Sequence, residues 1–303
     1  MDSTLLRIDN TIRSCANTCL RKYYFEYQRH LVPLAGSTAL RYGICWHAAM
    51  EAVYKDLHDG NFSPEGTGAR AIVAAAQAWK EYSASADFYD DYRTFENLAE
   101  SLSQYMNHYT AEFADVRVLE LEKAFAILMT PSPNQAKFYG TTPFYFTGRL
   151  DGRVEEFGAE WVLENKTTGR NLPSARAQLN RSAQFVGYAF ASGLSQVMVN
   201  FHQLTSTKSK KTGEYGKVTI NFSRDPQVYT PEVVEEWKDS LFETAGRIQN
   251  AIHHDNFPPN FDNCFQFGRC RYANLCEQYV HPTKVNTEGY TIREPWDVAK
   301  ELF

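Results

Sequence analysis

The chain has 303 residues, of which 43% are hydrophobic and 14% aromatic, so it can bury a full core and is not a disordered protein. Its net charge of −5 argues against a protein that binds nucleic acid over its whole surface. No apolar run approaches the ~20 residues that cross a membrane. The N-terminus lacks the layout of a secretory signal. A cytoplasmic location is therefore expected, where cysteines serve more often as ligands or core residues than in disulfides.

Helices are expected in the first third of the chain, because apolar and aromatic residues recur there at spacings of three and four. The first helical region covers 9–30 and is rich in aromatic residues. Amphipathic helices are expected at 41–58, 69–84 and 92–113, with glycines in the intervening loops. Most of these helices are expected to be packing elements.

Strands are expected in the middle of the chain, at 117–130, 142–157 and 160–168. A helix at about 174–193 follows, and then two strands at 195–205 and 216–223 joined by a lysine-bearing turn. Pro231 is expected to start a long helix to His254, and a loop-rich tail begins at Phe257. With no internal repeat and no clear linker, this pattern predicts one compact α/β domain with helical additions.

Two carboxylates and a lysine occupy the ends of neighbouring predicted strands. Asp151 lies in FYFTGRLDGRV, and Glu164 and Lys166 end EWVLENKTT. Side chains two apart on a strand share a face, so Glu164 and Lys166 project together. A hairpin turning between Glu155 and Glu160 would bring Asp151 close to them. Converging carboxylates suit Mg²⁺ or Mn²⁺, and a lysine can stabilise negative charge. The alternative is a solvated hairpin face, against which the apolar run 161–163 argues.

Basic residues cluster directly after this motif. Between Asn165 and Gly213 the chain has no acidic residue but carries Lys166, Arg170, Arg176, Arg181, Lys208, Lys210 and Lys211. Such asymmetry on an acidic protein is typical of a local phosphate-binding groove. For Lys208, Lys210 and Lys211 a solvated hairpin tip is the simpler interpretation.

Three cysteines, Cys264, Cys270 and Cys276, fall within a short C-terminal segment in the pattern C-x5-C-x5-C. A metal site needs a fourth ligand, for which Cys15, Cys19 and Cys45 are the candidates. Four thiolates can bind Zn²⁺ or hold a [4Fe–4S] cluster, and composition does not separate these two. Either would clamp the C-terminal segment to the N-terminal helix.

The order of these motifs resembles the RecB-like branch of the PD-(D/E)XK nuclease superfamily, in particular its iron–sulfur exonucleases of AddB-type, CRISPR-associated and phage origin. The resemblance covers nearly the whole chain. It rests on the segments beginning at Cys19 (CLRKYY) and Gly43 (GICWH), on the GRLD and ENK motifs, and on Gln184-x-x-x-Tyr188. The final cysteines complete it, although the usual spacing in the family is C-x2-C-x5-C.

The resemblance implies a restriction-endonuclease-like α/β core, a central mixed sheet flanked by helices, in a single domain spanning 1–303. The helical part at about 40–115 would be an insertion, and the cysteine cluster would join 15–25 to 260–280. The C-terminal segment would thus be stapled to N-terminal helical additions.

The resemblance also implies a role for each motif residue. Metal would be bound by His47, Asp151 and Glu164, with the backbone carbonyl of Asn165 as a further ligand. Lys166 would position the attacking water or stabilise the phosphate, and Gln184 and Tyr188 would hold DNA or order the site. The cluster ligands would be Cys19, Cys264, Cys270 and Cys276, leaving Cys15 and Cys45 as core thiols. Arg170, Arg176 and Arg181 are the candidate DNA-binding residues.

The expected function is that of a metal-dependent DNA exonuclease in a bacterial or phage-infected cell. It would use Mg²⁺ or Mn²⁺, carry a structural [4Fe–4S] cluster with Zn²⁺ as the alternative, and act on DNA with a free end. No G-x-x-x-x-G-K-[ST] loop is present, so any helicase or recombination partner would be a separate protein. The alternatives are a catalytically silent DNA-binding scaffold of the same fold and a zinc-stapled interaction module.

Some residues allow more than one interpretation. His47 could be a structural histidine whose partner is Glu51, one helical turn away. Glu120 and Glu122, on the strand expected at 117–130, could include a further acidic ligand, although a structural role is the simpler interpretation.

Overall fold

The computed structural model describes residues 2, 4–84, 88, 91–266 and 268–302, and it has the expected α/β architecture. One sheet has the strand order β1-β4-β5-β6-β7, with β3 paired to β4. Its parallel and antiparallel pairs make it a mixed sheet. The strands are β1 (Arg7–Ile8), β3 (Arg117–Met129), β4 (Phe144–Glu156), β5 (Ala159–Thr168), β6 (Gln196–Thr205) and β7 (Thr219–Val228).

Two compact units can be distinguished by their internal contacts. The first comprises Met1–Leu34, Ala124–Gly148 and Glu232–Phe303, and the second Ala35–Lys123 and Arg149–Pro231. The longer helices are α1 (Asn10–Thr18), α3 (Thr38–His58), α4 (Pro64–Ser83), α5 (Phe95–Tyr109), α8 (Ala183–Ser192) and α9 (Pro231–His253). The shorter ones are α2 (Leu20–Tyr23), α6 (Pro133–Tyr139), α7 (Leu172–Arg176) and α10 (Ala273–Cys276). The single domain expected from the sequence stays a prediction.

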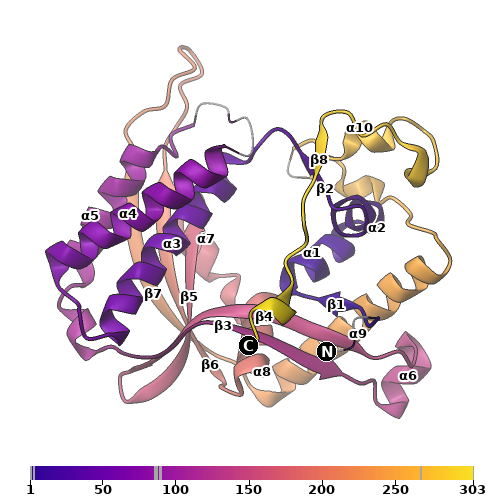
Figure 1. Ribbon diagram of the computed structural model, residues 1–303, viewed down its shortest axis with the longest axis horizontal. Helices are drawn as coiled ribbons and strands as arrows, with labels where there is room; N and C mark the ends of the chain where they lie inside the picture. The colour runs from indigo at the N-terminus through magenta and orange to yellow at the C-terminus, as the bar shows by residue number, and fades with distance from the viewer. Residues whose placement is uncertain (1, 3, 85–87, 89–90, 267, 303) are drawn as a thin grey trace. The chain divides into compact units, whose positions relative to one another are not determined.

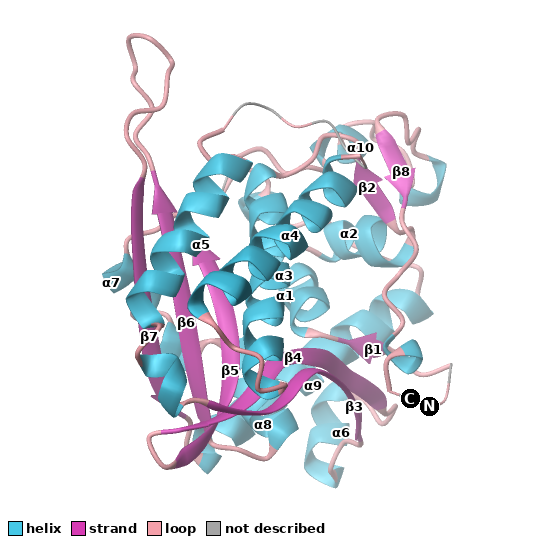
Figure 2. Ribbon diagram, turned by 60° about the vertical axis from the view of Figure 1, so that its left-hand side comes forward, coloured by secondary structure: helices cyan, strands magenta, loops and turns pink. Residues whose placement is uncertain are grey.

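In the second unit, α3, α4 and α5 cover one face of strands β5, β6 and β7 (Figures 1 and 2). Helix α3 begins after Ser37, whose side chain accepts a hydrogen bond from the backbone of Leu40, a typical N-cap. Trp46 and Met50, one turn apart, are fully buried. They belong to the same hydrophobic cluster as Leu163 of β5 and Met198 of β6. This core fixes α3 against the sheet.

The hairpin of β4 and β5 has the expected position and turn. The strands pair antiparallel, with Glu155 opposite Glu160 and Gly152 opposite Leu163. Phe157 and Gly158 between them both have positive φ, 54° and 73°, as a two-residue type I′ turn requires. Asp151 and Glu164 are the next residues along the two strands, so the register places these carboxylates on neighbouring strands.

The connection from β5 to β6 differs from the single helix expected at about 174–193. It contains α7, a 3₁₀ turn (Leu179–Arg181) and α8. Ser182 has extended backbone angles, φ −70° and ψ 111°, which no helix can continue through. Helix α8 then ends at Gly193, in the left-handed conformation with φ 73°, as helices commonly do. The break separates the arginines of this segment from the α8 residues of the predicted site.

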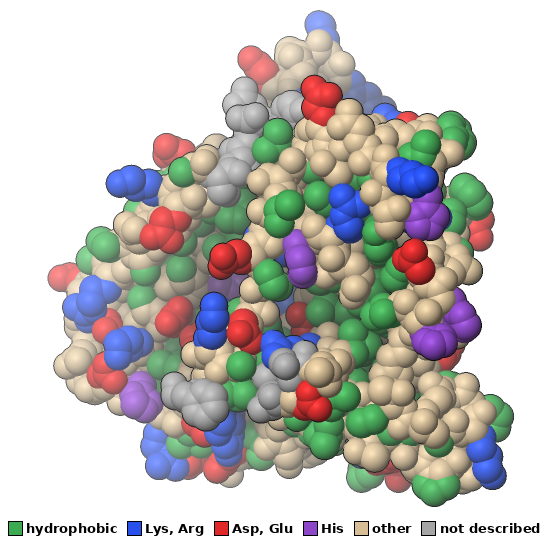
Figure 3. Space-filling model, turned by 45° about the vertical axis from the view of Figure 1, so that its right-hand side comes forward, with side chains coloured by type: hydrophobic (Ala, Val, Ile, Leu, Met, Phe, Trp, Pro, Cys, Tyr) green, Lys and Arg blue, Asp and Glu red, His purple; other side chains and the backbone are tan. Residues whose placement is uncertain are grey.

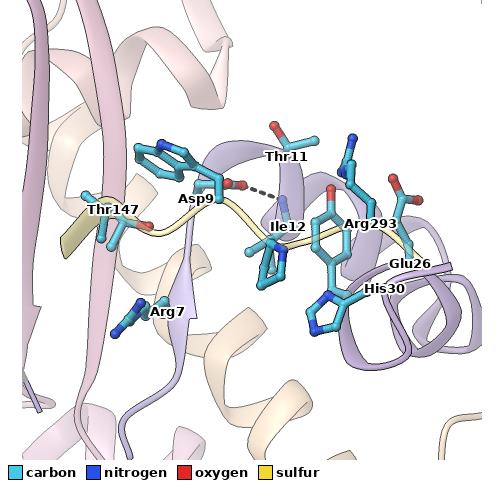
Figure 4. Close-up of a pocket in the computed structure, with 12 residues that line it drawn as sticks. Arg7, Asp9, Thr11, Ile12, Glu26, His30, Thr147 and Arg293 are labelled. Atoms are coloured by element: carbon cyan, nitrogen blue, oxygen red, sulfur yellow. Dashed lines mark hydrogen bonds between the residues drawn. The ribbon is translucent and has the colours of Figure 1, made fainter. Parts of the chain in front are cut away.

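The first unit contains α1, α2, α9, α10 and a small antiparallel sheet of β2 (Leu31–Pro33) and β8 (Tyr290–Ile292). Asp9 caps α1 by accepting a hydrogen bond from the backbone of Ile12 at 2.6 Å. A cavity of about 190 Å³ lies beside this cap. Figure 4 shows Asp9, Glu26, His30 and Arg293 around it, so acidic and basic side chains are mixed there.

Four short elements, α6, β1, β2 and β8, were not expected. Helix α6 carries a capping box, in which Ser132 and Gln135 each bond the other's backbone, a signal present in the sequence as S-P-N-Q. Strands β1 and the β2–β8 pair are too short for a periodic pattern. In the described part of the chain, no helix is both long and apolar enough to cross a membrane.

Candidate active site

The residues predicted to form the site all belong to the second unit. Helix α3 supplies His47, β4 supplies Asp151, and β5 supplies Glu164 and Lys166. Helix α8 carries Gln184 and Tyr188 at its first and second turns. The β4–β5 hairpin and the packing of α3 onto the sheet bring these elements together.

Asp151 accepts three hydrogen bonds at one oxygen. His47 Nδ1 lies 3.2 Å from Asp151 Oδ2. The backbone N–H of Asn165 donates to the same oxygen at 2.8 Å, and the Asn165 side-chain amide donates at 3.2 Å. Burial alone would raise the pKa of Asp151, but the charge and hydrogen bond of His47 and the Asn165 N–H outweigh it, so the pKa is lowered. Asp151 is therefore held as a carboxylate.

The partner of His47 is Asp151 rather than Glu51. Burial lowers the pKa of His47, but the negative charges of Asp151 and Glu164 together with the Asp151 hydrogen bond give a net increase. Glu51 is exposed on α3. The geometry thus supports a functional interpretation of His47 over a purely helical pair with Glu51.

Glu164 is 1% exposed, yet only one of its oxygens is hydrogen-bonded. Its Oε1 contacts Lys166 Nζ at 2.7 Å and accepts from Gln184 Nε2 at 2.8 Å. Its Oε2 has no hydrogen-bond partner among the described residues. Burial, and then repulsion from Asp151, raise the pKa of Glu164 to about 7. A buried carboxylate oxygen without a hydrogen-bond partner is suited to bind a cation.

Gln184 and Tyr188 order this carboxylate from α8. Gln184 Nε2 lies 2.8 Å from Glu164 Oε1 and 3.1 Å from Tyr188 Oη. The two residues are one helical turn apart and so share a face. The Q-x-x-x-Y motif therefore contacts Glu164 through Gln184. Lys166 lies over the ring of Phe185, 5.9 Å from its centroid.

Glu122 is closer to the site than the sequence suggested. It sits on β3 with φ 45°, a conformation that interrupts a regular strand. Its carboxylate pairs with Arg149 at 2.8 Å. Burial raises the pKa of Glu122 to about 7, with further contributions from Asp151 and Glu51 and an opposing one from Arg149. By contrast, Glu120 forms ion pairs with Lys123 and Arg153, as a structural residue does. A single residue with positive φ inside a strand has no reliable sequence signal.

The candidate DNA-binding arginines lie on the β5–β6 connection, also in the second unit. Arg170 and Arg181 are exposed. Arg176 is half-exposed and forms an ion pair with Asp225 at 2.8 Å, so part of its charge is neutralised. Lys208, Lys210 and Lys211 are exposed between β6 and β7. On the face drawn in Figure 3, acidic and basic side chains are interspersed.

The chemistry of the donor set fits a divalent cation. Carboxylate oxygens, one of them without a partner in the described part of the chain, are the ligands that Mg²⁺ and Mn²⁺ prefer, and imidazole is a common ligand of transition metals. Among the described residues, no three or more His, Cys, Asp or Glu side chains are grouped closely enough to hold a metal ion as they are placed here. His47 and Asp151 are in contact, and Glu164 lies near enough to both for their charges to affect its pKa, so these three remain the candidate ligands. Asn165 directs its side chain and its N–H to Asp151.

The four cysteines of the predicted cluster lie around one cavity of the first unit. Cys19, Cys264, Cys270 and Cys276 all line this cavity of about 520 Å³. Cys270 N–H donates to the carbonyl of Cys264 at 2.8 Å, and Asn260 N–H donates to Cys19 Sγ at 3.3 Å. Burial raises the pKa of Cys276 to about 11, with contributions from the other three thiols.

The remaining two cysteines are not part of this group. Cys15 is buried, and its thiol lies 3.7 Å from Glu26 Oε2. Cys45 is fully buried in the hydrophobic cluster of the second unit. Both are core thiols, as expected.

Comparison with known proteins identifies the family. The model of the PD-(D/E)XK nuclease superfamily matches residues 13–277. Among solved structures, the crystal structure of SSO0001 is similar, with 12% identity and a TM-score of 0.29, covering 86% of this chain and 96% of that one. No curated protein matches. The family match spans both the carboxylate site and the cysteine cavity and agrees with a restriction-endonuclease-like fold, a mixed sheet flanked by helices. The chain belongs to the PD-(D/E)XK nuclease superfamily.

Proposed function

We propose that this protein is a metal-dependent deoxyribonuclease that degrades DNA from a free end. The observation that carries the proposal is the buried, unpartnered Oε2 of Glu164 beside the ionised Asp151. A structural carboxylate would have both oxygens satisfied. Membership in a nuclease superfamily supplies the reaction class.

His47, Asp151 and Glu164 would hold Mg²⁺ or Mn²⁺. Bound there, the cation would neutralise charge on the scissile phosphate and lower the pKa of an attacking water. Lys166, 2.7 Å from Glu164, donates a hydrogen bond to the attacking water or to a phosphate oxygen. Gln184 donates to the same oxygen, Oε1 of Glu164, and so helps to fix this carboxylate while Oε2 stays without a donor from the residues described. Asn165 plays the corresponding role for Asp151 through its N–H.

DNA is the proposed substrate. Arg170 and Arg181 are exposed on the β5–β6 connection and would contact backbone phosphates, which any sequence presents. Arg176 would also contact a backbone phosphate if its ion pair with Asp225 were broken. Unwinding of duplex DNA would depend on a separate helicase or recombination protein, because the chain carries no P-loop motif.

The cysteine cavity is proposed to hold a structural [4Fe–4S] cluster, with Zn²⁺ as the alternative occupant. Four thiols line one cavity, and one of them accepts a backbone N–H. Four thiolates are the ligands that both kinds of site use. The cluster would tie α2 to the C-terminal segment within the first unit. Anaerobically purified protein distinguishes the two, because an iron–sulfur cluster absorbs broadly near ~400 nm and zinc does not absorb there.

The test is cleavage of linear and circular DNA, each single- and double-stranded, with Mg²⁺, Mn²⁺ or chelator. Wild type should degrade linear DNA only when metal is present, and Asp151→Ala should not. Cleavage of closed circular DNA would show that the same site acts as an endonuclease and not as an exonuclease. Metal-independent activity, or none from folded protein with a filled cysteine site, would favour a DNA-binding scaffold.

A further inference from the structure

A buried amide lies directly behind the carboxylate site. Asn200 of β6 is 1% exposed and pairs in parallel register with Asn165 of β5. Its Nδ2 donates to Asn165 Oδ1 at 2.8 Å and to Tyr105 Oη at 2.7 Å. None of the sequence motifs includes Asn200, because an isolated asparagine in a strand has no distinctive pattern.

These bonds give the chain of polar groups a fixed direction. The carboxylate of Asp151 can only accept, so Asn165 must turn its NH₂ toward it. Asn165 Oδ1 then points to Asn200, which must present its own NH₂. If Asn165 rotated by half a turn about its amide, its oxygen would face Asp151 and its NH₂ would face that of Asn200. As Asn200 stands, with its NH₂ toward Asn165 and its own Oδ1 without a partner among the residues that the structure describes, it supports the orientation in which Asn165 donates to Asp151.

Tyr105 anchors the far end of this chain. It is fully buried on α5, with its ring 5.5 Å from Trp46 and 4.8 Å from Tyr109 between centroids. Packed aromatic rings move little, so the hydroxyl that Asn200 bonds is a fixed reference point. The chain thus connects the rigid helix–sheet core to one oxygen of Asp151.

We propose that Asn200 is a positioning residue for metal binding, acting through Asn165 on Asp151. Three donors, including both Asn165 groups, converge on Asp151 Oδ2, which sets the plane of the carboxylate and leaves Oδ1 for the cation. Hydrogen bonds to ligating carboxylates commonly raise metal affinity. This inference rests on the proposed nuclease function and adds a determinant of cation affinity that does not touch metal or DNA.

The test is Mn²⁺ titration by calorimetry, run beside thermal unfolding and steady-state cleavage. Asn200→Leu preserves volume and removes the donor. It should weaken Mn²⁺ binding by roughly tenfold, lower cleavage at limiting Mn²⁺, recover most activity at saturating Mn²⁺, and leave KM for DNA unchanged. The matched control is Ser101→Ala, which removes a buried hydrogen bond to Tyr42 in the same core but does not lead to Asp151. It should cost stability without altering Mn²⁺ affinity.

A double-mutant cycle separates positioning from general loosening. In an Asn165→Ala background, which keeps the backbone N–H bond to Asp151, Asn200→Leu should have no further effect on Mn²⁺ affinity. Additive effects, or Mn²⁺ affinity of Asn200→Leu within twofold of wild type, would overturn the inference while leaving the nuclease proposal standing. A wild-type protein that binds no Mn²⁺ and cuts no DNA would overturn both.

Discussion

Glu164 is stabilised on one side only. Its Oε1 has two donors, but its buried Oε2 has none among the described residues, and burial beside Asp151 raises its pKa to about 7. A group held under such conditions costs stability, and proteins retain such costs mainly at functional sites. Asp151 is the opposite case, because its donors lower its pKa. The site therefore pairs a carboxylate whose pKa is lowered with one whose pKa is raised.

His202 is another buried residue whose polar atoms lack hydrogen-bond partners among the described residues. It is fully buried, neither ring nitrogen has a hydrogen-bond partner among the described residues, and its ring lies 4.0 Å from Trp46 between centroids. Burial lowers the pKa of His202 to about 3, against ~6.5 in an unfolded chain. The folded state therefore excludes a proton that the unfolded state takes up below pH ~6.5.

His202→Phe should make folding less sensitive to acid. The destabilisation from His202 is absent above pH ~6.5 and grows by about 1.4 kcal/mol per pH unit as the pH falls toward the folded pKa. Urea unfolding at several pH values between 6.5 and 4 should show a flatter decline for His202→Phe than for wild type. The control is His254→Gln at an exposed position, which should leave the pH dependence of the unfolding free energy unchanged. Parallel curves for wild type and His202→Phe would contradict the assignment.

At the scale of residues, only part of the site could be predicted from the sequence. Asp151, Glu164 and Lys166 were singled out because charged side chains at the end of a buried strand are unusual. Asn200 was not singled out, and Glu122 was named only as a possible further ligand, because the first depends on cross-strand register and the second on an unusual backbone conformation. Both are set by tertiary pairing, which a local pattern does not contain.

At the scale of elements, most helices and strands followed their periodic patterns. Strand β5 (Ala159–Thr168) and helix α9 (Pro231–His253) lie within one residue of the expected bounds, because an apolar run and an N-terminal proline are strong signals. The single helix expected at 174–193 is instead divided into α7, a 3₁₀ turn and α8, because the backbone of Ser182 is extended. Apolar periodicity alone does not reveal such a break.

Close approach of helix α9 to α6 requires Gly246. A Cβ there would lie 2.3 Å from the backbone oxygen of Tyr139, so the two segments would have to separate. Gly246→Ala should therefore destabilise the protein by about 1–3 kcal/mol, although alanine favours a helix. The matched substitution is Gly68→Ala in α4, where the new Cβ would make an ordinary 3.7 Å contact with Met106. It should stabilise by about 0.5–1 kcal/mol.

Chemical denaturation of both glycine variants checks this pair. Opposite signs are expected, because helix propensity acts alike in both and only Gly246 faces a backbone atom. Two stabilised variants would show that α6 is free to move away from α9.

At the scale of the whole molecule, the two kinds of predicted site belong to different units. The carboxylates and Lys166 lie in the second unit, and the four cavity cysteines lie in the first. The cysteine residues are far apart in sequence, so a cluster joining them would close a loop of more than 200 residues. Cross-links of that kind stabilise chiefly by restricting the unfolded chain.

Cys270→Ser should therefore lower thermal stability and remove the metal of the cysteine site. The expected signs are loss of iron and of absorbance near ~400 nm, with a lower unfolding temperature and less soluble protein. Cys45→Ser, a buried thiol of the second unit, is the control and should retain full iron content. A soluble Cys270→Ser protein with unchanged unfolding temperature would contradict a structural role for the cluster.

The central claim is that Glu164 completes a cation site for hydrolysis of DNA. The measurement that tests it most directly is the rate of degradation of end-labelled linear DNA with Mg²⁺ by wild type and Glu164→Gln, at equal folded concentration. Glutamine keeps the size and the contact with Gln184 but removes the charge at Oε2. We expect the rate for Glu164→Gln to be at least ~10³-fold lower, with the free energy of unfolding in chelator unchanged or increased. If a stably folded Glu164→Gln protein degraded DNA at the wild-type rate, Glu164 would not be part of a catalytic cation site.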